Sequence, residues 1–356
     1  MTPTATTTVP TPVTTAAVTT ATVTTAAVTT ATTDETFLAL VEPLRRELTV
    51  HCYRMLGSVH EAEDLVQETY IRAWRAYHGF EQRSSVRTWM YRIATNVCLT
   101  ALERNQRRPL PTGLGQPNAD PHGGLVERPE LPWLEPLPDA MVWGTSDPDP
   151  SEAAVTKDSV RLAFVAALQH LTAQQRAVVI LRDVLDWRAS EVAAALEISV
   201  AAVNSTLQRA RAQLEKQRGS AHAVLPDGDE RAKDLLDRYL SAFERYDVPR
   251  IVALLTEDAV WEMPPFTGWY LGRADISTLI GERCPAKEGD DMRFLRTSAN
   301  GQPVLAVYMR GEDGAHRAFQ LQQLTLTEGG VSHVACYFDT TLFEAFGLPE
   351  VLARRS

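Results

Sequence analysis

The stretch LEISVAAVNSTLQRARAQLEK, residues 196–216, decides how this chain is interpreted. Its apolar residues recur at alternating steps of 3 and 4, which predicts one buried face of an α-helix. That face consists of Val200, Val203, Leu207, Ala210 and Leu214. The other side carries side chains that mostly donate hydrogen bonds: Asn204, Ser205, Gln208, Arg209 and Arg211. Such a helix suits a partner rich in acceptors, although the whole chain has a formal net charge of −10.

The residues before this helix complete a helix–turn–helix pattern. In the preceding stretch DWRASEVAAALEIS, Val192, Ala195 and Leu196 form an inward face, and Ser199 is well suited to cap the next helix. In the major groove of DNA, Asn and Gln pair with adenine, and Arg pairs with guanine or phosphate. A solvated surface helix of a three-helix bundle explains the same periodicity, so the rest of the chain must decide between the two interpretations.

Length and composition indicate a multidomain globular protein. At 356 residues the chain is too long for one ordinary core, and 44% hydrophobic with 22% charged residues is typical of a soluble protein. No apolar run approaches the roughly 20 residues that span a bilayer. The four cysteines show no CxxC spacing, which argues against zinc and disulfides and fits the reducing cytoplasm. They are Cys52, Cys98, Cys284 and Cys336.

Composition and periodicity divide the chain into five segments. The N-terminal tail holds 17 threonines and repeats VTTAAVTTAT, so we expect it to be disordered. The middle segment holds ten prolines, eight acidic residues and one basic residue, so we expect an extended acidic linker. The last segment has a helical stretch at 231–255 followed by alternating strand-like runs, which predicts an α+β domain. The segments are the tail 1–33, a helical module 34–108, the linker 109–156, a second helical module 157–218 and the α+β domain 226–350.

Charge is unevenly distributed between these segments. Residues 82–108 hold six arginines and one acidic residue, and residues 157–218 hold nine basic and six acidic residues. The acidic total therefore hides two locally basic helical modules. Because nucleic-acid binding depends on the charge of the domain that touches it, the whole-chain charge does not exclude DNA.

Three stretches carry a resemblance to a known family. Residues 168–216 (LQHLTAQQRAVVILRDVLDW…LEK) resemble the −35-binding domain of bacterial sigma-70 factors of the extracytoplasmic-function (ECF) group. Residues 51–80 (HCYRMLGSVHEAEDLVQETYIRAWRAYHGF) and 84–104 (SSVRTWMYRIATNVCLTALER) resemble that group's −10-binding and polymerase-binding domain. The resemblance implies a cytoplasmic, non-enzymatic transcription factor whose partners are core RNA polymerase and promoter DNA, with no metal and no cofactor. An anti-sigma protein and a small ligand stay open as further partners.

The helix EAEDLVQETYIRAW is the expected polymerase-binding element. Its predicted buried stripe is Ala62, Leu65, Val66, Thr69 and Ala73. An acidic exposed stripe suits a basic protein partner rather than DNA, and in the family this helix docks on the clamp helices of the polymerase. A salt-bridged solvated face is the other interpretation, with Glu68 and Arg72 at a favourable i,i+4 spacing. The resemblance assigns polymerase binding to Glu61, Asp64, Gln67, Glu68 and Arg72.

The resemblance assigns promoter contacts to both modules. Aromatic and basic residues can hold a displaced DNA strand, although Trp89 fits a packing role equally well. The −10 candidates are Arg87, Trp89, Tyr91, Arg92, Asn96, Arg104, Arg107 and Arg108. The −35 candidates are Ser199, Asn204, Ser205, Gln208, Arg209 and Arg211. Ala201, Ala202 and Asn204 replace bulkier or basic residues of many relatives, so the promoter sequence is not defined.

The acidic linker has two interpretations. An extended, proline-rich acidic strand suits a basic channel in the polymerase that normally holds RNA, as the corresponding linker of the family does. The other interpretation is an inert tether between the two helical modules.

The last segment resembles a SnoaL-like domain, a cone-shaped α+β fold shared with polyketide cyclases and ketosteroid isomerases. The resemblance rests on residues 235–276 and covers 231–345. It implies an apolar ligand pocket, for which the candidates are Trp261, Met263, Pro264, Phe266, Trp269 and Tyr270. Catalysis in relatives needs a general base, and no spacing selects one among Asp258, His316, His333 and Asp339. We therefore expect no catalytic residue here, and a domain that senses a ligand or touches polymerase or DNA.

Three functions compete at this point. The first is a promoter-specificity subunit of RNA polymerase, regulated in cis by its terminal domain. The second is an enzyme whose activity resides in the terminal domain, and the third is a stand-alone repressor or activator. An acidic docking stripe and a separate −10-like module are superfluous for a plain repressor, and no acid/base pair is identifiable for an enzyme. The sequence therefore favours the first function.

Overall fold

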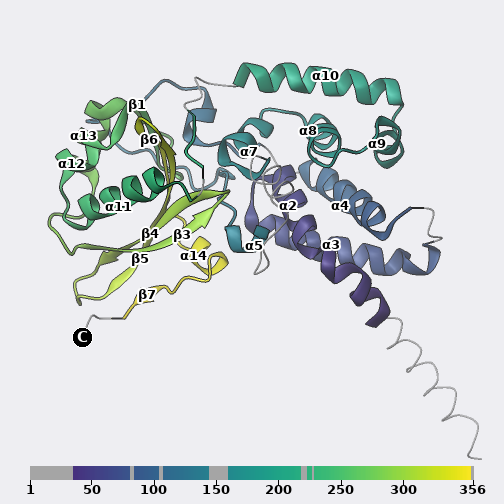
Figure 1. The fold of residues 1–356 in the computed structure, drawn as a ribbon, viewed down its shortest axis with the longest axis horizontal. Coiled ribbons are helices and arrows are strands. Elements are labelled where there is room, and N and C mark those ends of the chain that lie inside the picture. The colour runs from purple at the N-terminus through teal and green to yellow at the C-terminus, as the bar shows by residue number, and fades with distance from the viewer. Residues whose placement is uncertain are drawn as a thin grey trace, which may run out of the picture.

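The protein consists of a helical body and an α+β domain that lie side by side (Figure 1). The computed structural model describes residues 35–80, 84–103, 107–143, 159–217, 223–226 and 228–353. The threonine-rich tail and Arg104 lie outside these ranges. Within them, no helix combines the length and the apolar character needed to cross a membrane.

The first helical module is a three-helix unit built around α3. Ser58 caps α3 by accepting a hydrogen bond from the Glu61 amide, and Ser85 caps α4 in the same way. Of the predicted stripe on α3, all members but the half-buried Leu65 are fully buried. Pro43 lies in a 3-10 turn that separates a short helix at 35–41 from α2. The elements are η1 (Glu42–Leu44), α2 (Arg45–Leu56), α3 (Val59–Ala76), η2 (Tyr77–Gly79) and α4 (Val86–Leu102).

The second helical module contains the predicted helix–turn–helix. The Thr172–Gln175 capping box and the Ser199 cap are both present, the latter accepting from the Ala202 amide at 3.1 Å. Val203, Leu207 and Ala210 are buried as expected. The expectation for Val200 is wrong: it is 44% exposed, because it is the first residue of its helix, next to the open turn. The elements are α7 (Leu162–Leu168), α8 (Ala173–Val179), the π-helical η4 (Ile180–Val184), α9 (Ala189–Leu196) and α10 (Val200–Gln217).

The two helical modules pack against each other to form one body. The buried Arg176 of α8 donates to the Met55 carbonyl at the end of α2. The buried Arg54 of α2 donates to the Ser159 hydroxyl at 2.5 Å, just ahead of α7. The rings of Tyr91 and Trp187 meet edge to face, with centroids 6.3 Å apart. Buried arginines that bind carbonyls across a boundary fix the relative position of its two sides.

The expectation of an extended linker is wrong for its described part. Residues 109–134 form a loop that closes at its base, where the Leu134 amide donates to the Pro109 carbonyl at 3.1 Å. Leu134 and Leu137 are fully buried, so the segment contributes apolar surface to the core. Two short elements interrupt it, η3 (Pro111–Leu114) and α5 (Asp139–Trp143).

The terminal domain is a curved seven-stranded sheet with three helices on one face and the short α14 on the other. The sheet order is β2-β1-β6-β5-β4-β3, with β7 beside β5, and only the β1–β6 pair is parallel. The expected helix at 231–255 is two helices, because Tyr246 adopts a positive φ of 51° and Asp247 caps the second one. The helices are α11 (Glu230–Glu244), α12 (Val248–Ala253), α13 (Gly272–Arg283) and α14 (Leu342–Ala345). The strands are β1 (Leu255–Glu262), β2 (Trp269–Leu271), β3 (Met292–Ala299), β4 (Gln302–Arg310), β5 (His316–Thr327), β6 (Gly330–Tyr337) and β7 (Val351–Leu352).

Two hydrophobic cores use opposite faces of this sheet. Side chains such as Tyr239, Trp261 and Val334 fill the space between one face and helices α11, α12 and α13. The other face contributes side chains such as Tyr308 and Tyr337 to the core that runs through the helical body. The terminal domain therefore shares buried apolar surface with the helical body.

Candidate nucleic-acid and protein interfaces

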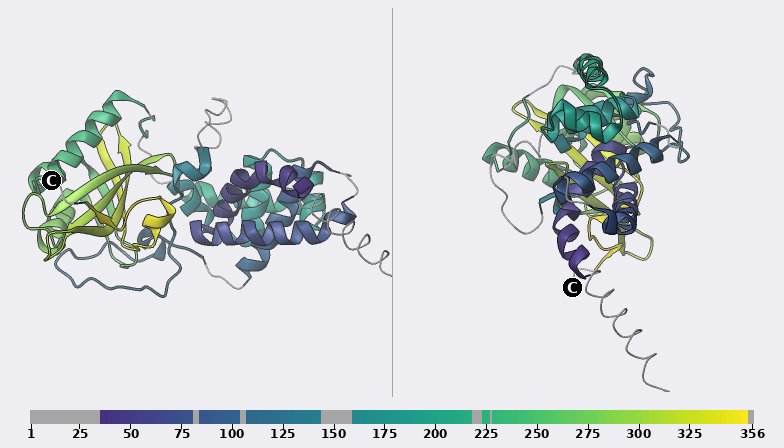
Figure 2. Two further views of the ribbon diagram at one scale, coloured as in Figure 1. Left: turned by 90° about the horizontal axis from the view of Figure 1, so that it is seen from below. Right: turned by 90° about the vertical axis from the view of Figure 1, so that its right-hand side faces the viewer.

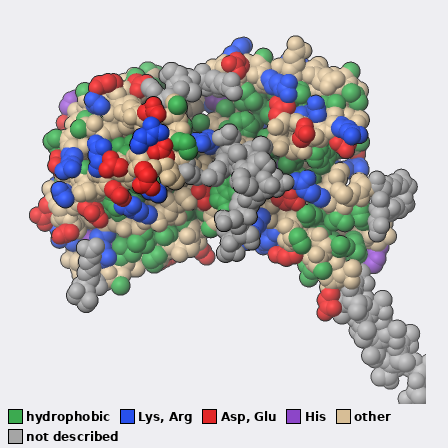
Figure 3. All heavy atoms as spheres, viewed as in Figure 1, with side chains coloured by type: hydrophobic (Ala, Val, Ile, Leu, Met, Phe, Trp, Pro, Cys, Tyr) green, Lys and Arg blue, Asp and Glu red, His purple; other side chains and the backbone are tan. Residues whose placement is uncertain are grey.

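Helix α10 presents the predicted −35 residues to solvent. Its opposite face packs on α8 and α9, which positions the exposed face as a unit. The Arg211 guanidinium binds the Asp183 carboxylate through two hydrogen bonds of 2.9 and 2.6 Å, and this pairing raises the pKa of Arg211. In Figure 3 basic side chains appear along the edge of the helical body where α10 runs. All six candidates are exposed: Ser199, Asn204, Ser205, Gln208, Arg209 and Arg211.

Helix α4 exposes only part of the predicted −10 set. Arg87, Arg92 and Asn96 are exposed, and Arg87 binds Glu47 at 2.7 Å while lying over the Tyr91 ring. Trp89 is half-buried and stacks on Phe80, with ring centroids 4.6 Å apart. The structure contradicts Tyr91 as an accessible DNA contact.

Tyr91 lies in the core of the helical body. It is 1% exposed, meets the His51 ring edge to face, and donates to Glu47 at 3.1 Å. The ring also touches Trp187 of the second module. Burial raises the pKa of Tyr91, which keeps the hydroxyl protonated as a donor. Its position therefore indicates packing between helices, which periodicity on α4 alone did not distinguish from exposure.

Arg108 is a second correction among the −10 candidates. It is 8% exposed and binds Glu61 at 2.6 Å, with Glu135 at 3.8 Å and the Trp133 carbonyl at 3.2 Å. Because the Arg108 side chain is buried and its guanidinium binds Glu61, it is not an exposed group that a DNA phosphate could reach. Arg107, the neighbour, is exposed and donates to the Gly113 carbonyl at 2.7 Å.

Helix α3 carries the predicted polymerase-binding residues. Asp64, Gln67 and Arg72 are exposed, and Arg72 binds the half-buried Glu68 at 2.7 Å, which confirms the i,i+4 pair. Glu61 was expected to bind polymerase with an exposed carboxylate, but this carboxylate binds the buried Arg108 instead. The exposed part of the acidic stripe is therefore the part that begins at Asp64.

The linker carboxylate Glu135 was missed by sequence reasoning. Its Oε2 accepts from the Ser58 hydroxyl and the Val59 amide, each at 2.9 Å, at the N-terminus of α3. His60 completes the cluster at 3.1 Å from the same oxygen, and this hydrogen bond raises the pKa of His60. A carboxylate is stabilised at a helix N-terminus by free amides and by the helix dipole. Nothing in the linear order of an acidic linker singles out this one acid among eight.

None of the six residues predicted to form an aromatic ligand pocket lines a cavity described in the structure. Trp261, Met263 and Tyr270 are buried in the domain core, and Phe266 packs edge to face on Phe338. The remaining two candidates bind backbone instead, since the Pro264 carbonyl accepts from the Phe338 amide and Trp269 donates to a linker carbonyl. Trp261, Met263, Tyr270 and Phe266 therefore serve packing within the domain.

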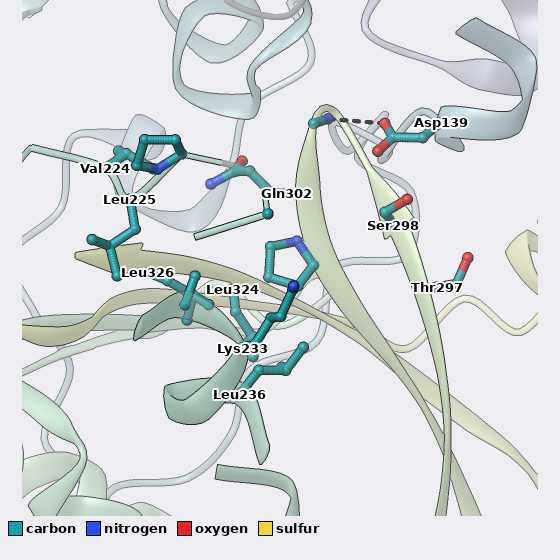
Figure 4. A pocket seen from close by; sticks show the side chains of 15 residues that line it. Asp139, Val224, Leu225, Lys233, Leu236, Thr297, Ser298, Gln302, Leu324 and Leu326 are labelled. Atoms are coloured by element: carbon teal, nitrogen blue, oxygen red, sulfur yellow. Dashed lines mark hydrogen bonds between the residues drawn. The ribbon is translucent and has the colours of Figure 1, made fainter. Parts of the chain in front are cut away.

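A cavity of about 260 Å³ opens elsewhere, at the end of the domain that faces the helical body. Figure 4 shows Leu236 and Lys233 of α11 facing Leu324 and Leu326 of β5 across it. Asp139, on the far side, accepts from the Gly301 amide at 2.9 Å. None of the six predicted pocket residues lines this cavity.

The four candidate bases lie outside any cavity described for the domain. His333 binds Glu262 at 2.7 Å, and the Glu262 carboxylate is 1% exposed. Glu262 is paired with Ala335, which faces the core of the helical body, so this pair lies on the opposite sheet face from the cone interior. His316 contacts the Asp290 carbonyl, Asp339 accepts from Thr341, and Asp258 is exposed on β1. In the described part of the chain, no cluster of three or more metal-binding side chains occurs.

Family models match all three folded parts of the chain. The Sigma-70 region 2 model matches residues 40–108, the Sigma-70 region 4 model 161–214, and the SnoaL-like domain model 236–334. The ECF RNA polymerase sigma factor SigG of Mycobacterium tuberculosis is 60% identical over 319 residues, which cover 89% of this chain and 85% of SigG. This chain is an ECF RNA polymerase sigma factor.

Other relatives agree with this assignment. The ECF sigma factor SigX of Bacillus subtilis is 30% identical over 210 residues, 58% of this sigma factor and 95% of SigX. The crystal structure of the Mycobacterium tuberculosis ECF sigma factor SigJ covers 88% of this chain and 100% of SigJ, with a TM-score of 0.55 and 22% identity. The SigJ comparison confirms the fold of this ECF sigma factor: two helical modules followed by a SnoaL-like domain.

Proposed function

We propose that this sigma factor binds core RNA polymerase through α3, reads the −35 element with α10 and the −10 element with the exposed part of α4, and helps to open the duplex in the cytoplasm. The observation that carries the proposal is the face of α10, where six polar side chains point away from the body. An amphipathic helix at the end of a helix–turn–helix, with donors outward, fits the major groove.

The structure corresponds to a closed conformation of this sigma factor, in which the two DNA-reading modules touch. The −35 and −10 names imply an offset of about 25 base pairs, or about 85 Å along B-DNA. In the structure Arg92 of α4 lies 3.8 Å from Glu197 at the end of α9. Because the two reading modules touch, they have to separate before both promoter elements are bound.

We further propose that the terminal domain regulates this separation in cis. Asn300, in the β3–β4 turn, is fully buried and donates to the Tyr53 hydroxyl at 2.9 Å and to the Val160 carbonyl at 2.6 Å. Its side-chain oxygen accepts from the Leu137 amide at 3.0 Å. One residue of the terminal domain thus holds the first module, the second module and the linker together.

Transcription in vitro with core polymerase and a cognate promoter tests the first proposal. Reversing charge with Asp64→Lys and Glu68→Lys should weaken co-elution with core polymerase and lower transcript yield at least tenfold, because several exposed contacts are lost together. The matched control is Glu63→Lys, an exposed residue about a quarter-turn away on the same helix. Unchanged binding of the double variant would remove α3 from the polymerase interface.

Deleting residues 226–356 tests regulation in cis. If the terminal domain holds the modules closed, the truncated chain should change the transcript yield relative to the full-length protein. Equal yields from the two proteins at equal concentration would contradict regulation by this domain.

A further inference from the structure

The terminal domain binds the linker loop through backbone hydrogen bonds at one edge of its sheet. β2 is an edge strand, and the Ala119 amide of the loop donates to the Trp269 carbonyl at 2.7 Å. The Arg128 amide donates to the Pro265 carbonyl at 2.9 Å, and the Val126 carbonyl accepts from the Thr267 amide at 2.9 Å. A segment that adds its backbone to a sheet edge uses the same recognition as a peptide bound by β-augmentation.

Side chains of the domain hold the rest of the loop. Arg283 of α13 donates to the carbonyls of His122 and Gly123 at 2.8 and 2.7 Å. The neighbouring Glu282 binds the His122 ring at 3.0 Å. At the other end of the loop, the Thr112 amide donates to the buried Glu262 carboxylate at 2.9 Å. The left view of Figure 2 shows the loop running along the margin of the domain.

Because this loop is closed, its residues do not add to the distance that the linker can span. Residues 109–134 would span about 85–90 Å if fully extended, which matches the offset between the two promoter elements. Instead, Pro109 and Leu134 are hydrogen-bonded at the base of the loop. With the loop closed, only the residues after Leu134 are left to span the two helical modules, and opening the loop requires its contacts with the domain edge to break.

We propose that the β1–β2 end of the terminal domain and α13 form a peptide-binding surface for the sigma factor's own linker. Core polymerase competes with this surface for the linker, a claim that rests on the function proposed above. The two bound states exclude each other. When the loop is closed, backbone groups of residues 112–128 form hydrogen bonds with the domain edge. The same residues must leave this edge before they can lie extended in a polymerase channel.

Hydrogen exchange of the full-length protein, free and with core polymerase, tests the competition. The variant is Arg283→Ala combined with Glu282→Ala, which leaves the linker sequence and both helical modules intact. The control is Arg310→Ala, an exposed arginine of the same domain that binds Glu288 and Asp291 and does not touch the linker. Removing two hydrogen bonds and an ion pair should speed exchange of amides in 112–128 by roughly tenfold. The affinity for core polymerase should rise by up to the same factor, because a larger fraction of the protein is binding-competent.

Each outcome bears on a different claim. In the wild-type complex, the Thr112, Ala119 and Arg128 amides of the loop, and the Thr267 amide that donates to the Val126 carbonyl, should lose protection when polymerase binds. Retained protection of the Thr267 amide in a complex that does form would overturn the competition, as would faster exchange in the double variant without any gain in affinity. If neither protein binds core polymerase while the free variant does exchange faster, the proposed polymerase function fails and the competition fails with it.

Discussion

At the scale of single residues, Asn300 has the largest structural consequence. It occupies the first position of a two-residue turn with Gly301, and both have positive φ, 56° and 65°. This Asn-Gly pair is the strongest short signal for a hairpin. The turn geometry places the Asn side chain in the junction between three segments, where it makes the contacts described above.

Replacing Asn300 with Gly tests this junction. Glycine keeps the left-handed backbone but removes four buried hydrogen bonds, including a long one from Gln323, so the free energy of unfolding should fall by about 2–4 kcal/mol. Chemical denaturation measures the change. The matched control is Asp290→Gly, since Asp290 is exposed and has a similar φ of 69°. A change no larger than that of the control would show that the Asn300 side chain does not hold the junction.

His60 makes the contact between linker and α3 depend on pH. Its pKa is raised by the hydrogen bond to Glu135, with further contributions from Asp339 and Glu63. A raised pKa in the folded state means that the stabilisation is complete below the unfolded pKa of 6.5 and is lost as pH rises through the folded value. The pH window therefore begins near 6.5 and extends upward.

The difference in Tm between wild type and His60→Ala should accordingly be largest at about pH 6 and should shrink above the folded pKa of His60. Thermal denaturation across this range measures it. In a Glu135→Gln background the same substitution should show little pH dependence, because the carboxylate that favours the imidazolium is gone. A constant difference in Tm across the range would contradict the coupling.

At the scale of elements, α10 combines a packed face with an exposed reading face. Arg209 contacts Thr206 at 3.3 Å and Arg211 is held by Asp183, so both guanidinium groups start from defined positions. The Arg211–Asp183 pair is exposed, and ion pairs of this kind contribute little to stability. A DNA phosphate can therefore replace Asp183 as the partner of Arg211 with little loss of folding stability.

Replacing Arg209 and Arg211 with Ala should weaken promoter binding and flatten its salt dependence. Each lost phosphate contact lowers the slope of log K against log salt concentration by roughly 0.9. Binding titrations at several salt concentrations measure the slope, with Arg238→Ala on the terminal domain as the control. An unchanged footprint and slope would remove both arginines from the interface.

At the scale of the whole molecule, closure is the dominant feature. Contacts from Arg54, Arg176 and Tyr91 join the two helical modules, and the terminal domain packs on the body that they form. These contacts are buried, so under the proposed function the binding partners must supply the free energy that separates the modules.

Spin labels on exposed positions of α4 and α10 measure the opening. Thr100→Cys and Ala212→Cys are suitable, with Cys284→Ser, because Cys52, Cys98 and Cys336 are buried. The distance between the labels should increase by several tens of ångströms when core polymerase and promoter DNA are added, as the spacing of the two elements requires. The same distance in the free protein and in the promoter complex would contradict a closed resting state.

The sequence by itself determined the local features of this protein. Periodicity and the Ser199 cap predicted the helix–turn–helix, and alternation predicted strands after the helical stretch of the last segment, because these signals depend on neighbours along the chain. The exposed donor face of α10 followed from the same periodicity. Resemblance to sigma factors added the order of the domains.

Only the tertiary structure decided which charged and aromatic residues are available. Arg108 and Glu61 look like surface residues in the sequence, but they bind each other, and Tyr91 is buried where the two modules meet. The aromatic cluster around Trp261 fills a core, and the acidic linker folds back on the terminal domain. These outcomes depend on contacts between segments far apart in the sequence, such as Tyr53 with Asn300, 247 residues later. Local patterns hold no information on such contacts, because burial is set by what the rest of the chain places nearby.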